Sequence, residues 1–293
     1  MELNNLAGTI WALEESYFNR MSYLAMSKPE VLERMAAQVR DRTEPYFTAR
    51  PSLAIPQSGS VKAASSSSYH HMVPKVVSKN GLIAVIPIDG VMTREGDFCS
   101  WGTLDLTEWI LEASNDPDVS GIVLAANSGG GDASGIEIFD AAVKQCKKPV
   151  IGYVGNAAYS GANWALAHCN EIVMESKTIS GMGSIGVYTM HVDFEKHLEN
   201  QGVNAQMIRA RGSENKALSN MYEALPEAAK KDAEDNVTKV RETFVKAVKS
   251  GRPGVDEIVF DGKTFNGTEC IKYGLANSIG FLGDAIARAD KLG

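Results

Sequence analysis

Ser160 is the residue of this sequence whose surroundings best suit a nucleophile. It lies in the stretch GYVGNAAYSGANWALAHC (Gly152–Cys169), directly after an apolar run that predicts a strand. The residues around it are small, and those that follow it predict a helix. Small residues before a helix are also typical of close packing. The stretch by itself therefore leaves two interpretations open, a nucleophile or a packing residue.

A serine nucleophile needs a base, and histidine is the usual one. His168 lies about two turns along the helix predicted after Ser160, so we expect its side chain to point away from the serine. The other histidines lie in a predicted linker or in a polar amphipathic stretch, and none belongs to a motif that supports a Ser/His/Asp triad. The five histidines are His70, His71, His168, His191 and His197.

Lysine is the alternative base, but its amine must then be neutral near pH 7. A free lysine has a pKa of about 10.4, so the pKa of a dyad lysine must fall to about 7, which requires an apolar or crowded pocket. Most lysines here lie in polar helical stretches. Lys216 differs, because it follows a predicted strand and a glycine and is flanked by Ala217 and Leu218. The local pattern alone is still typical of a surface lysine.

A glycine-rich segment, AANSGGGDASG (Ala125–Gly135), follows one predicted strand and precedes a predicted helix. Consecutive glycines free the backbone to adopt positive φ and to expose its N–H groups. Such groups can cradle a phosphate or stabilise an oxyanion. The segment matches neither the P-loop pattern nor the dinucleotide-binding pattern, because no Lys-Ser or Lys-Thr follows and Ser134 stands where a third glycine should be. The segment by itself therefore leaves two interpretations open, a site built on backbone N–H groups or a tight strand-to-helix turn.

Composition excludes several classes of protein. The 293 residues are 44% hydrophobic, which is ample for a buried core, and the net charge of −7 gives no indication of a nucleic-acid partner. The four cysteines form no CxxC pair, which favours free thiols in a reducing compartment over a zinc site or disulfides. No apolar run reaches the roughly 18 residues of a membrane span, and the N-terminal residues lack the pattern of a secretory signal. We therefore expect a protein that is neither membrane-bound nor secreted.

The pattern along the chain predicts three parts. Residues 1–50 predict an amphipathic helical arm, residues 51–77 a Ser/Pro-rich linker, and residues 78–293 an α/β domain. In the domain, short apolar strands alternate with helices, which indicates parallel strands joined by crossover helices. The predicted strands are Gly81–Gly90, Gly121–Asn127, Pro149–Val154, Glu171–Ser176 and Ala205–Ala210, and the predicted helices are Asp105–Pro117, Gly135–Cys146, Asn163–Cys169 and Pro226–Gly251.

Five segments in order resemble the signal peptide peptidase A family, serine peptidase family S49. The similarity extends over about residues 78–291. The segment at 212–226 is most similar to the capsid-processing branch of tailed bacteriophages. The segments are NSGGG (127–131), AAYSGANWALA (157–167), GMGSIGV (181–187), GSENKALSNMYEALP (212–226) and ECIKYGLANSIG (269–280).

The resemblance implies a ClpP/crotonase-like fold, a spiral of repeated β-β-α units. It implies that Ser160 is the nucleophile and Lys216 the general base, and that backbone N–H groups of Gly130, Gly131 and Gly161 form the oxyanion hole. It implies no metal and no cofactor. Two departures from the family pattern bear on these residues. Gly129 replaces a proline, and one extra residue lies between Gly212 and Lys216, so Lys177 is kept as an alternative base.

The phage head protease branch also implies partners and a location. We expect scaffold or head proteins as substrates, a homo-oligomer in which the lysine can come from a neighbouring chain, and no nucleic-acid or membrane partner. The expected location is the host cytoplasm or the interior of the phage prohead. The arm is a candidate propeptide, oligomer contact or docking segment. Two other functions stay open. One is a crotonase-type acyl-CoA enzyme, and the other is a non-catalytic capsid assembly factor.

Overall fold

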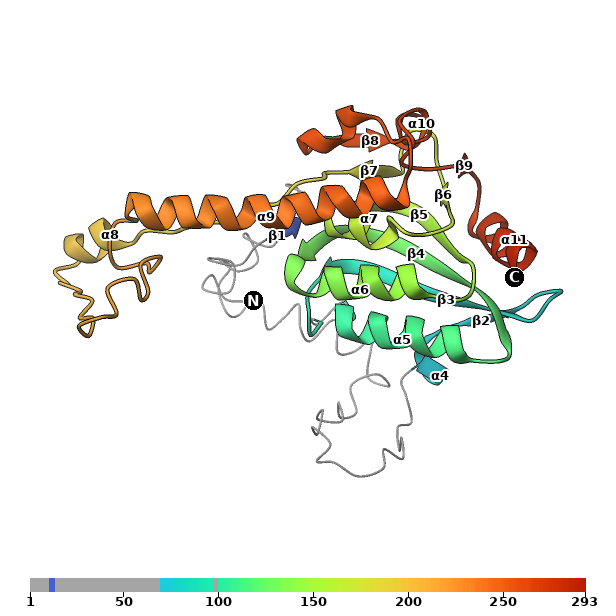
Figure 1. Cartoon of the computed structure of the whole chain (residues 1–293), viewed down its shortest axis with the longest axis horizontal. Helices are drawn as coiled ribbons and strands as arrows, with labels where there is room; N and C mark the ends of the chain where they lie inside the picture. Colours follow the sequence, from blue (N-terminus) through green and yellow to red (C-terminus); the bar gives the residue numbers. More distant parts are fainter. Residues whose placement is uncertain (1–10, 14–68, 97–99) are drawn as a thin grey trace, which may run out of the picture.

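The computed structural model of the chain describes residues 11–13, 69–96 and 100–293 (Figure 1). The predicted helical arm, residues 1–50, lies outside the described residues except for a short strand, β1 (Trp11–Leu13). At these three residues the prediction of a helix is wrong. The reason is a tertiary one, because β1 pairs with a strand of the sheet far away in sequence.

The folded domain begins earlier than residue 78. Residues 69–77 of the predicted linker form helix α4 (Tyr69–Met72) and strand β2 (Lys75–Val77), and the rest of that linker lies outside the described residues. Tyr69 anchors this segment, because its side chain is 1% exposed and belongs to the main hydrophobic core. Strand β2 then pairs with the first long strand of the sheet.

A mixed sheet forms the centre of the domain, in the order β2-β3-β4-β5-β6-β9. All neighbours from β3 to β9 are parallel, and β2 is antiparallel to β3. The α/β class predicted from the sequence, with its parallel strands, is therefore confirmed. The strands are β3 (Leu82–Met92), β4 (Val119–Asp132), β5 (Val150–Tyr159), β6 (Glu171–Met174) and β9 (Ser278–Ile279).

Both faces of this sheet are covered, which explains why its strands are continuously apolar. Successive side chains point to opposite faces, so Ile86 of β3 joins the main core while Val85 joins a smaller core on the other face. The main core lies beneath three helices, and the C-terminal helix covers the other face (Figure 1). These helices are α5 (Thr103–Asn115), α6 (Ala133–Gln145), α7 (Gly161–Leu166) and α11 (Leu282–Leu292).

A second, short layer of strands continues from the carboxyl end of β5. Strand β7 (Gly181–Gly183) pairs in parallel with Ala157–Tyr159, the last three residues of β5, and on its other edge with β8 (Thr264–Asn266). The 3₁₀ helix η2 (Glu257–Asp261) and helix α10 (Gly267–Lys272) flank β8. This layer adds a wall beside the point where β5 ends.

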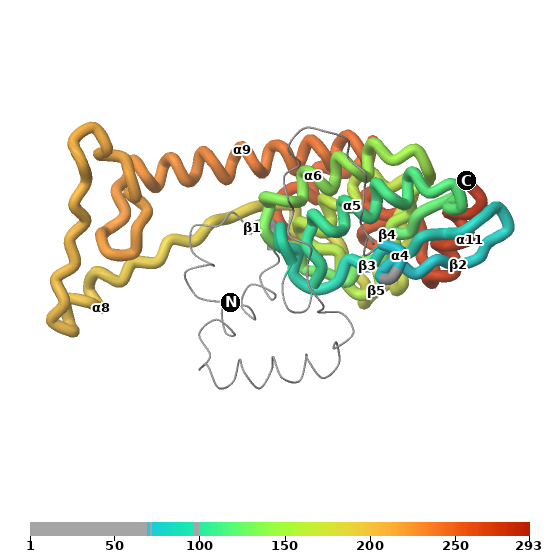
Figure 2. The backbone as a smooth tube through the Cα atoms, turned by 90° about the horizontal axis from the view of Figure 1, so that it is seen from below, coloured from blue at the N-terminus to red at the C-terminus, as the bar shows by residue number. Residues whose placement is uncertain are grey.

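The segment from α8 (Glu195–Asn200) to the first half of the 25-residue helix α9 (Glu227–Gly251) projects from the body as an extension (Figures 1 and 2). The strand predicted at Ala205–Ala210 is absent. Those residues are mostly exposed, Ile208 is 94% exposed, and no neighbouring strand supplies hydrogen bonds there. No helix of the described part of the chain is both long and apolar enough to cross a membrane.

The extension is joined to the body through the second half of α9. Phe244 is fully buried and stacks on Trp164 of α7, with ring centroids 4.9 Å apart and planes 9° from parallel. Gly251, the last residue of α9, lies so close to the end of α7 that an added Cβ would be 2.0 Å from the carbonyl oxygen of Ala167. Helix α9 is therefore fixed at one end and free of the body at the other.

Phe244→Ala is expected to lower the free energy of unfolding by about 3 kcal/mol, since it deletes a buried aromatic ring and leaves a cavity. Urea unfolding followed by fluorescence measures this change, and Trp164 reports on the same contact. Val237→Ala is the matched control, because Val237 is a half-exposed residue on the projecting part of α9 and should cost well under half as much. Equal losses in the two variants would contradict the anchoring role of Phe244.

Candidate active site

Ser160 is the single residue between strand β5 and helix α7. Its backbone has φ 51° and ψ −117°, a conformation that side-chain-bearing residues rarely adopt and that costs of order 1–3 kcal/mol. Strain of this kind is typical of a nucleophile at a sharp strand-to-helix turn. The Ser160 side chain is 1% exposed, so it lies beneath the surface of the described structure.

The segment GMGSIGV holds Ser160 in this conformation, a role that the sequence did not reveal. The Ser160 N–H donates to the carbonyl of Gly183 at 2.8 Å. The Ser160 hydroxyl donates only a long bond, 3.5 Å, to the carbonyl of Gly186. Gly183 has φ 112°, and an added Cβ would lie 2.5 Å from the carbonyl oxygen of Lys263. The backbone of Ser160 is thus fixed while its hydroxyl is weakly held, which suits a group that must give up its proton.

The glycine segment is the end of a strand and not a turn. Strand β4 continues through it to Asp132, and α6 starts at the next residue. Gly130 has φ 92°, so glycine is required there by conformation. Gly131 is required by space, because an added Cβ would lie 1.8 Å from the carbonyl oxygen of Met92 in β3.

The sheet brings this segment to the level of Ser160. Ser128 of β4 is the register partner of Ala158 in β5, and Gly130 and Ser160 each lie two residues further along their strands. The carboxyl ends of neighbouring parallel strands meet at one edge of a sheet, where the ligands of such sheets bind. Ser160 and the predicted oxyanion-hole residues therefore gather at one place.

The three predicted oxyanion donors differ in their availability. The Gly130 N–H donates to the Ser128 hydroxyl at 3.1 Å, and that hydroxyl in turn donates to the carbonyl of Gly90. Gly161 is the first residue of α7, where a backbone N–H has no partner within its own helix. Gly131 lies in the paired end of β4.

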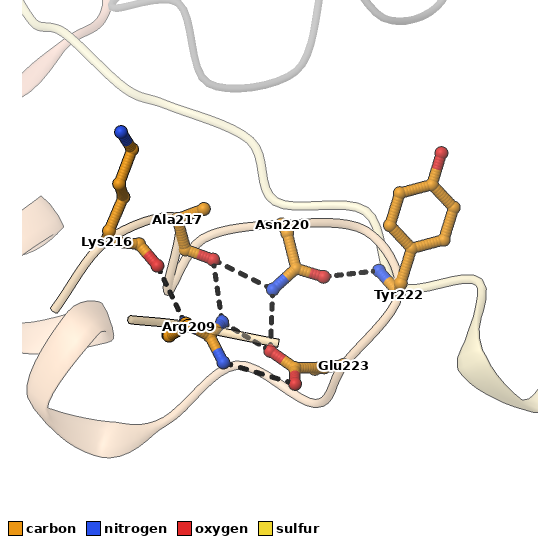
Figure 3. A network of polar contacts seen from close by, with 6 residues as sticks. All are labelled: Arg209, Lys216, Ala217, Asn220, Tyr222 and Glu223. Carbon is orange, nitrogen blue, oxygen red and sulfur yellow. Dashed lines mark hydrogen bonds and ion pairs between the residues drawn. The ribbon is translucent and has the colours of Figure 1, made fainter. Parts of the chain in front are cut away.

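Lys216 lies outside this cluster, in the loop of the extension between α8 and α9. The Arg209 guanidinium donates to the carbonyls of Lys216 (2.7 Å) and Ala217 (3.1 Å) and pairs with Glu223 at 2.5 Å (Figure 3). The hydrogen bond from Arg209 lowers the pKa of Glu223 below its usual value. Ala217 has φ 56°. Polar contacts thus hold the loop backbone, and the Lys216 side chain points away from them and is exposed (Figure 3).

Within one chain, helix α9 separates Lys216 from Ser160. The loop of Lys216 precedes the start of α9 at Glu227, whereas α7, which directly follows Ser160, contacts α9 at Phe244. About 26 Å of helix lies between these two points, at 1.5 Å per residue. The structure therefore does not bring the two predicted dyad residues of one chain together.

The other candidate bases do not contact Ser160 either. His168 is engaged elsewhere, as the sequence indicated, with Nδ1 2.6 Å from Asp140 and Nε2 3.5 Å from the Ser250 hydroxyl. Lys177 is exposed on the loop between β6 and β7, and its carbonyl accepts from the Thr268 N–H. Within the part of the chain that the structure describes, Ser160 has no ionisable hydrogen-bond partner.

The family model of Peptidase family S49 matches residues 142–293. The chain belongs to peptidase family S49. The match includes Ser160, Gly161 and Lys216, whereas Gly130 and Gly131 precede it.

Two curated proteins illustrate what this S49 chain is similar to. It is 27% identical over 215 residues to Protease 4 of Haemophilus influenzae. This match covers 72% of the chain and 34% of that protein. It is 29% identical over 215 residues to the capsid assembly protease C of Escherichia phage lambda, covering 70% of the chain and 48% of that protein. The chain thus spans about a third to a half of the length of these relatives.

Among solved structures, the S49 chain is similar to that of a ClpP1 point mutant from Listeria monocytogenes. The TM-score is 0.43 at 12% identity, and the match covers 69% of this chain and 94% of that one.

Proposed function

We propose that the protein is a serine endopeptidase whose nucleophile is Ser160 and whose general base is Lys216. The observation that carries the proposal is the strained position of Ser160 between β5 and α7, inside the region that matches peptidase family S49. A buried residue in a disfavoured conformation needs a reason, and a fixed nucleophile supplies one.

The reaction starts with attack of the Ser160 hydroxyl oxygen on a peptide carbonyl carbon, while the neutral amine of Lys216 accepts the hydroxyl proton. Backbone N–H groups of Gly131 and Gly161, and that of Gly130 once it leaves the Ser128 hydroxyl, then stabilise the oxyanion. Each such donor is worth about 3 kcal/mol of transition-state stabilisation. The lysine gives its proton to the leaving amine, an acyl-serine remains, and water hydrolyses it by the same steps.

The lysine in this scheme comes from a neighbouring chain of a homo-oligomer. Lys216 is exposed in the loop between α8 and α9, and α9 is a helix anchored on α7 whose first half projects from the body, so the extension has the shape needed to reach another copy (Figure 2). Entering a second chain's active site would also remove the lysine from water, which favours the neutral form of an amine.

The natural substrates in this proposal are phage scaffold and head proteins cleaved during capsid maturation. Support comes from the similarity to the capsid assembly protease C of phage lambda. An extended substrate segment would pair with the end of β4 beside Ser160, as peptides do at open sheet edges.

The test is incubation of the purified chain with an unfolded protein, and separately with a phage scaffold protein and a phage head protein. Mass spectrometry then identifies new termini, and a serine-reactive phosphonate identifies the labelled residue. We expect cleavage in both incubations and label on Ser160. Absence of both cleavage and label, or protection of the chain from thermal unfolding by an acyl-CoA thioester, would overturn the proposal.

A further inference from the structure

Strand β1 lies on the edge of β4 that faces the nucleophile. Its residues pair antiparallel with the end of β4, Trp11 with Asp132, Ala12 with Gly131 and Leu13 with Gly130. A strand has two edges, and β3 occupies one of them at this level through the pairs Val91–Gly130 and Met92–Gly131. Strand β1 must therefore occupy the other edge, the one that β5 holds as far as Ser128.

The pairing register explains why this edge of β4 is open beyond Ser128. Strand β5 leaves β4 after the pair Ser128–Ala158, because the chain turns into α7 two residues later at Ser160. The end of β4 that β5 leaves unpaired consists of Gly129, Gly130, Gly131 and Asp132. Three of these residues have no side chain, so an incoming peptide meets mainly backbone N–H and C=O groups beside the serine.

Such an edge binds extended peptides through main-chain hydrogen bonds, with little demand on their sequence. We propose that residues 11–13 occupy the substrate-binding edge of β4 in the resting protein and act as an internal competitor of the substrate. This inference rests on the proposed function. It also fits the 1% exposure of Ser160, since a substrate can reach the hydroxyl only after something over it moves.

The pairing has the properties of a reversible block. A three-residue strand makes only a few hydrogen bonds, each of small net value in water, so a longer substrate strand can displace it. Its connection to the same chain keeps it at a high effective concentration, so it competes even though each contact is weak. The apparent KM of the resting protein is therefore raised while kcat is unaffected.

Ala12→Pro tests this block in the full chain. Proline removes the backbone N–H at the centre of β1 and restricts the preceding residue. We expect the KM for an unfolded-protein substrate to fall about tenfold with kcat unchanged. Gly283→Pro is the control, because Gly283 is exposed in the first turn of α11, where a helix tolerates proline, and it should leave both constants as in the wild type. An unchanged KM in Ala12→Pro would overturn the inference.

A cross-link tests the pairing without using activity. Trp11 and Asp132 are register partners, and the Cα atoms of partners on antiparallel strands are about 4.5–5.5 Å apart, within the range that a disulfide spans. We expect Trp11→Cys/Asp132→Cys to oxidise to a disulfide, identified by peptide mapping without reduction. Trp11→Cys/Lys144→Cys is the control, because Lys144 is exposed about 18 Å along α6 from Asp132, and its two introduced thiols should not cross-link.

The two tests separate this inference from the proposed function. If cleavage and phosphonate labelling fail in all variants but the disulfide between positions 11 and 132 forms, the proposed function fails while the pairing stands. If the wild type cleaves, the disulfide-linked form should lose most of its activity and regain it on reduction. A linked form as active as its reduced form, or no disulfide at all, would show that β1 does not block the site.

Discussion

Ser160→Ala and Lys216→Ala are each expected to lower the rate of peptide-bond cleavage by about 10⁴-fold or more. Removal of a nucleophile or of its base costs this much in serine peptidases, because what remains is stabilisation by the oxyanion donors and by binding. Mass-spectrometric counting of new termini in an unfolded protein measures the loss. Lys230→Ala is the matched control, since Lys230 is an exposed lysine on α9, and its activity should equal that of the wild type.

An equal mixture of the two inactive variants should recover about a quarter of the wild-type activity. Half of the chains then supply an intact Ser160, and half of their neighbours in a cyclic oligomer supply an intact Lys216. The mixture must be unfolded and refolded together, or dissociated and reassembled, so that chains exchange. No recovery, with both variants assembled as the wild type, would show that the lysine acts within its own chain. Full activity of Lys216→Ala would instead direct the search to Lys177.

Gly131→Ala is expected to lower the free energy of unfolding by about 5 kcal/mol or more, the largest loss of stability among the changes considered. The new Cβ would lie 1.8 Å from the carbonyl oxygen and 2.5 Å from the carbonyl carbon of Met92, so the backbone of β3 must move. Both atoms are main-chain atoms of a neighbouring strand, and no rotamer change relieves the clash. Urea unfolding, together with the soluble yield, measures the effect.

Gly283→Ala is the matched control for this substitution. Gly283 lies in the first turn of α11, and an added Cβ would meet nothing within 4 Å. Alanine is a better helix former than glycine, so this variant should equal the wild type or gain up to about 1 kcal/mol. If Gly131→Ala stayed within that margin too, β3 and β4 would not approach as closely as the structure indicates.

The core of the fold could be predicted because buried elements have a recognisable apolar pattern in their own sequence. Residues 82–92 form one strand of a sheet covered on both faces, and their sequence is almost entirely apolar. Helix α9 is bounded as predicted, by Pro226 at its start and Gly251 at its end. In both cases the pattern that decides the structure lies within the element itself.

Long-range strand pairing explains where the secondary structure predicted from the sequence differs from the structure. Trp11–Leu13 lies in a segment with a helical pattern and becomes a strand only because the end of β4 offers a free edge. Residues 205–210 have the pattern of a strand and remain unpaired because no edge lies beside them. The glycine segment left a tight turn and a site built on backbone N–H groups open, and its extension of β4 depends on β3 approaching Gly131. None of these partners is a sequence neighbour.

The candidate site also has features that could be predicted from the sequence and features that could not. Ser160 and the glycines could be placed together because strands, helices and their connections set their positions within one domain. The distance of Lys216 from Ser160 could not be foreseen, since it depends on how far α9 projects from α7. The support that the carbonyls of Gly183 and Gly186 give to Ser160 also comes from pairing of β7 with β5, although the motif GMGSIGV could have drawn attention to it.

Because α9 carries Lys216 away from its own Ser160, the proposed peptidase activity would be lost on dilution to separate chains. Each extension would reach into the body of a second chain, while the body of its own chain receives the extension of a third chain. Such contacts join unlike surfaces and close into rings or continue as filaments. The cleavage rate per chain would then rise with protein concentration and level off once every Ser160 lies beside Lys216 of a neighbouring chain. Newly made copies at low abundance would stay latent without any covalent modification, and packing many of them into one small volume would be enough to start them.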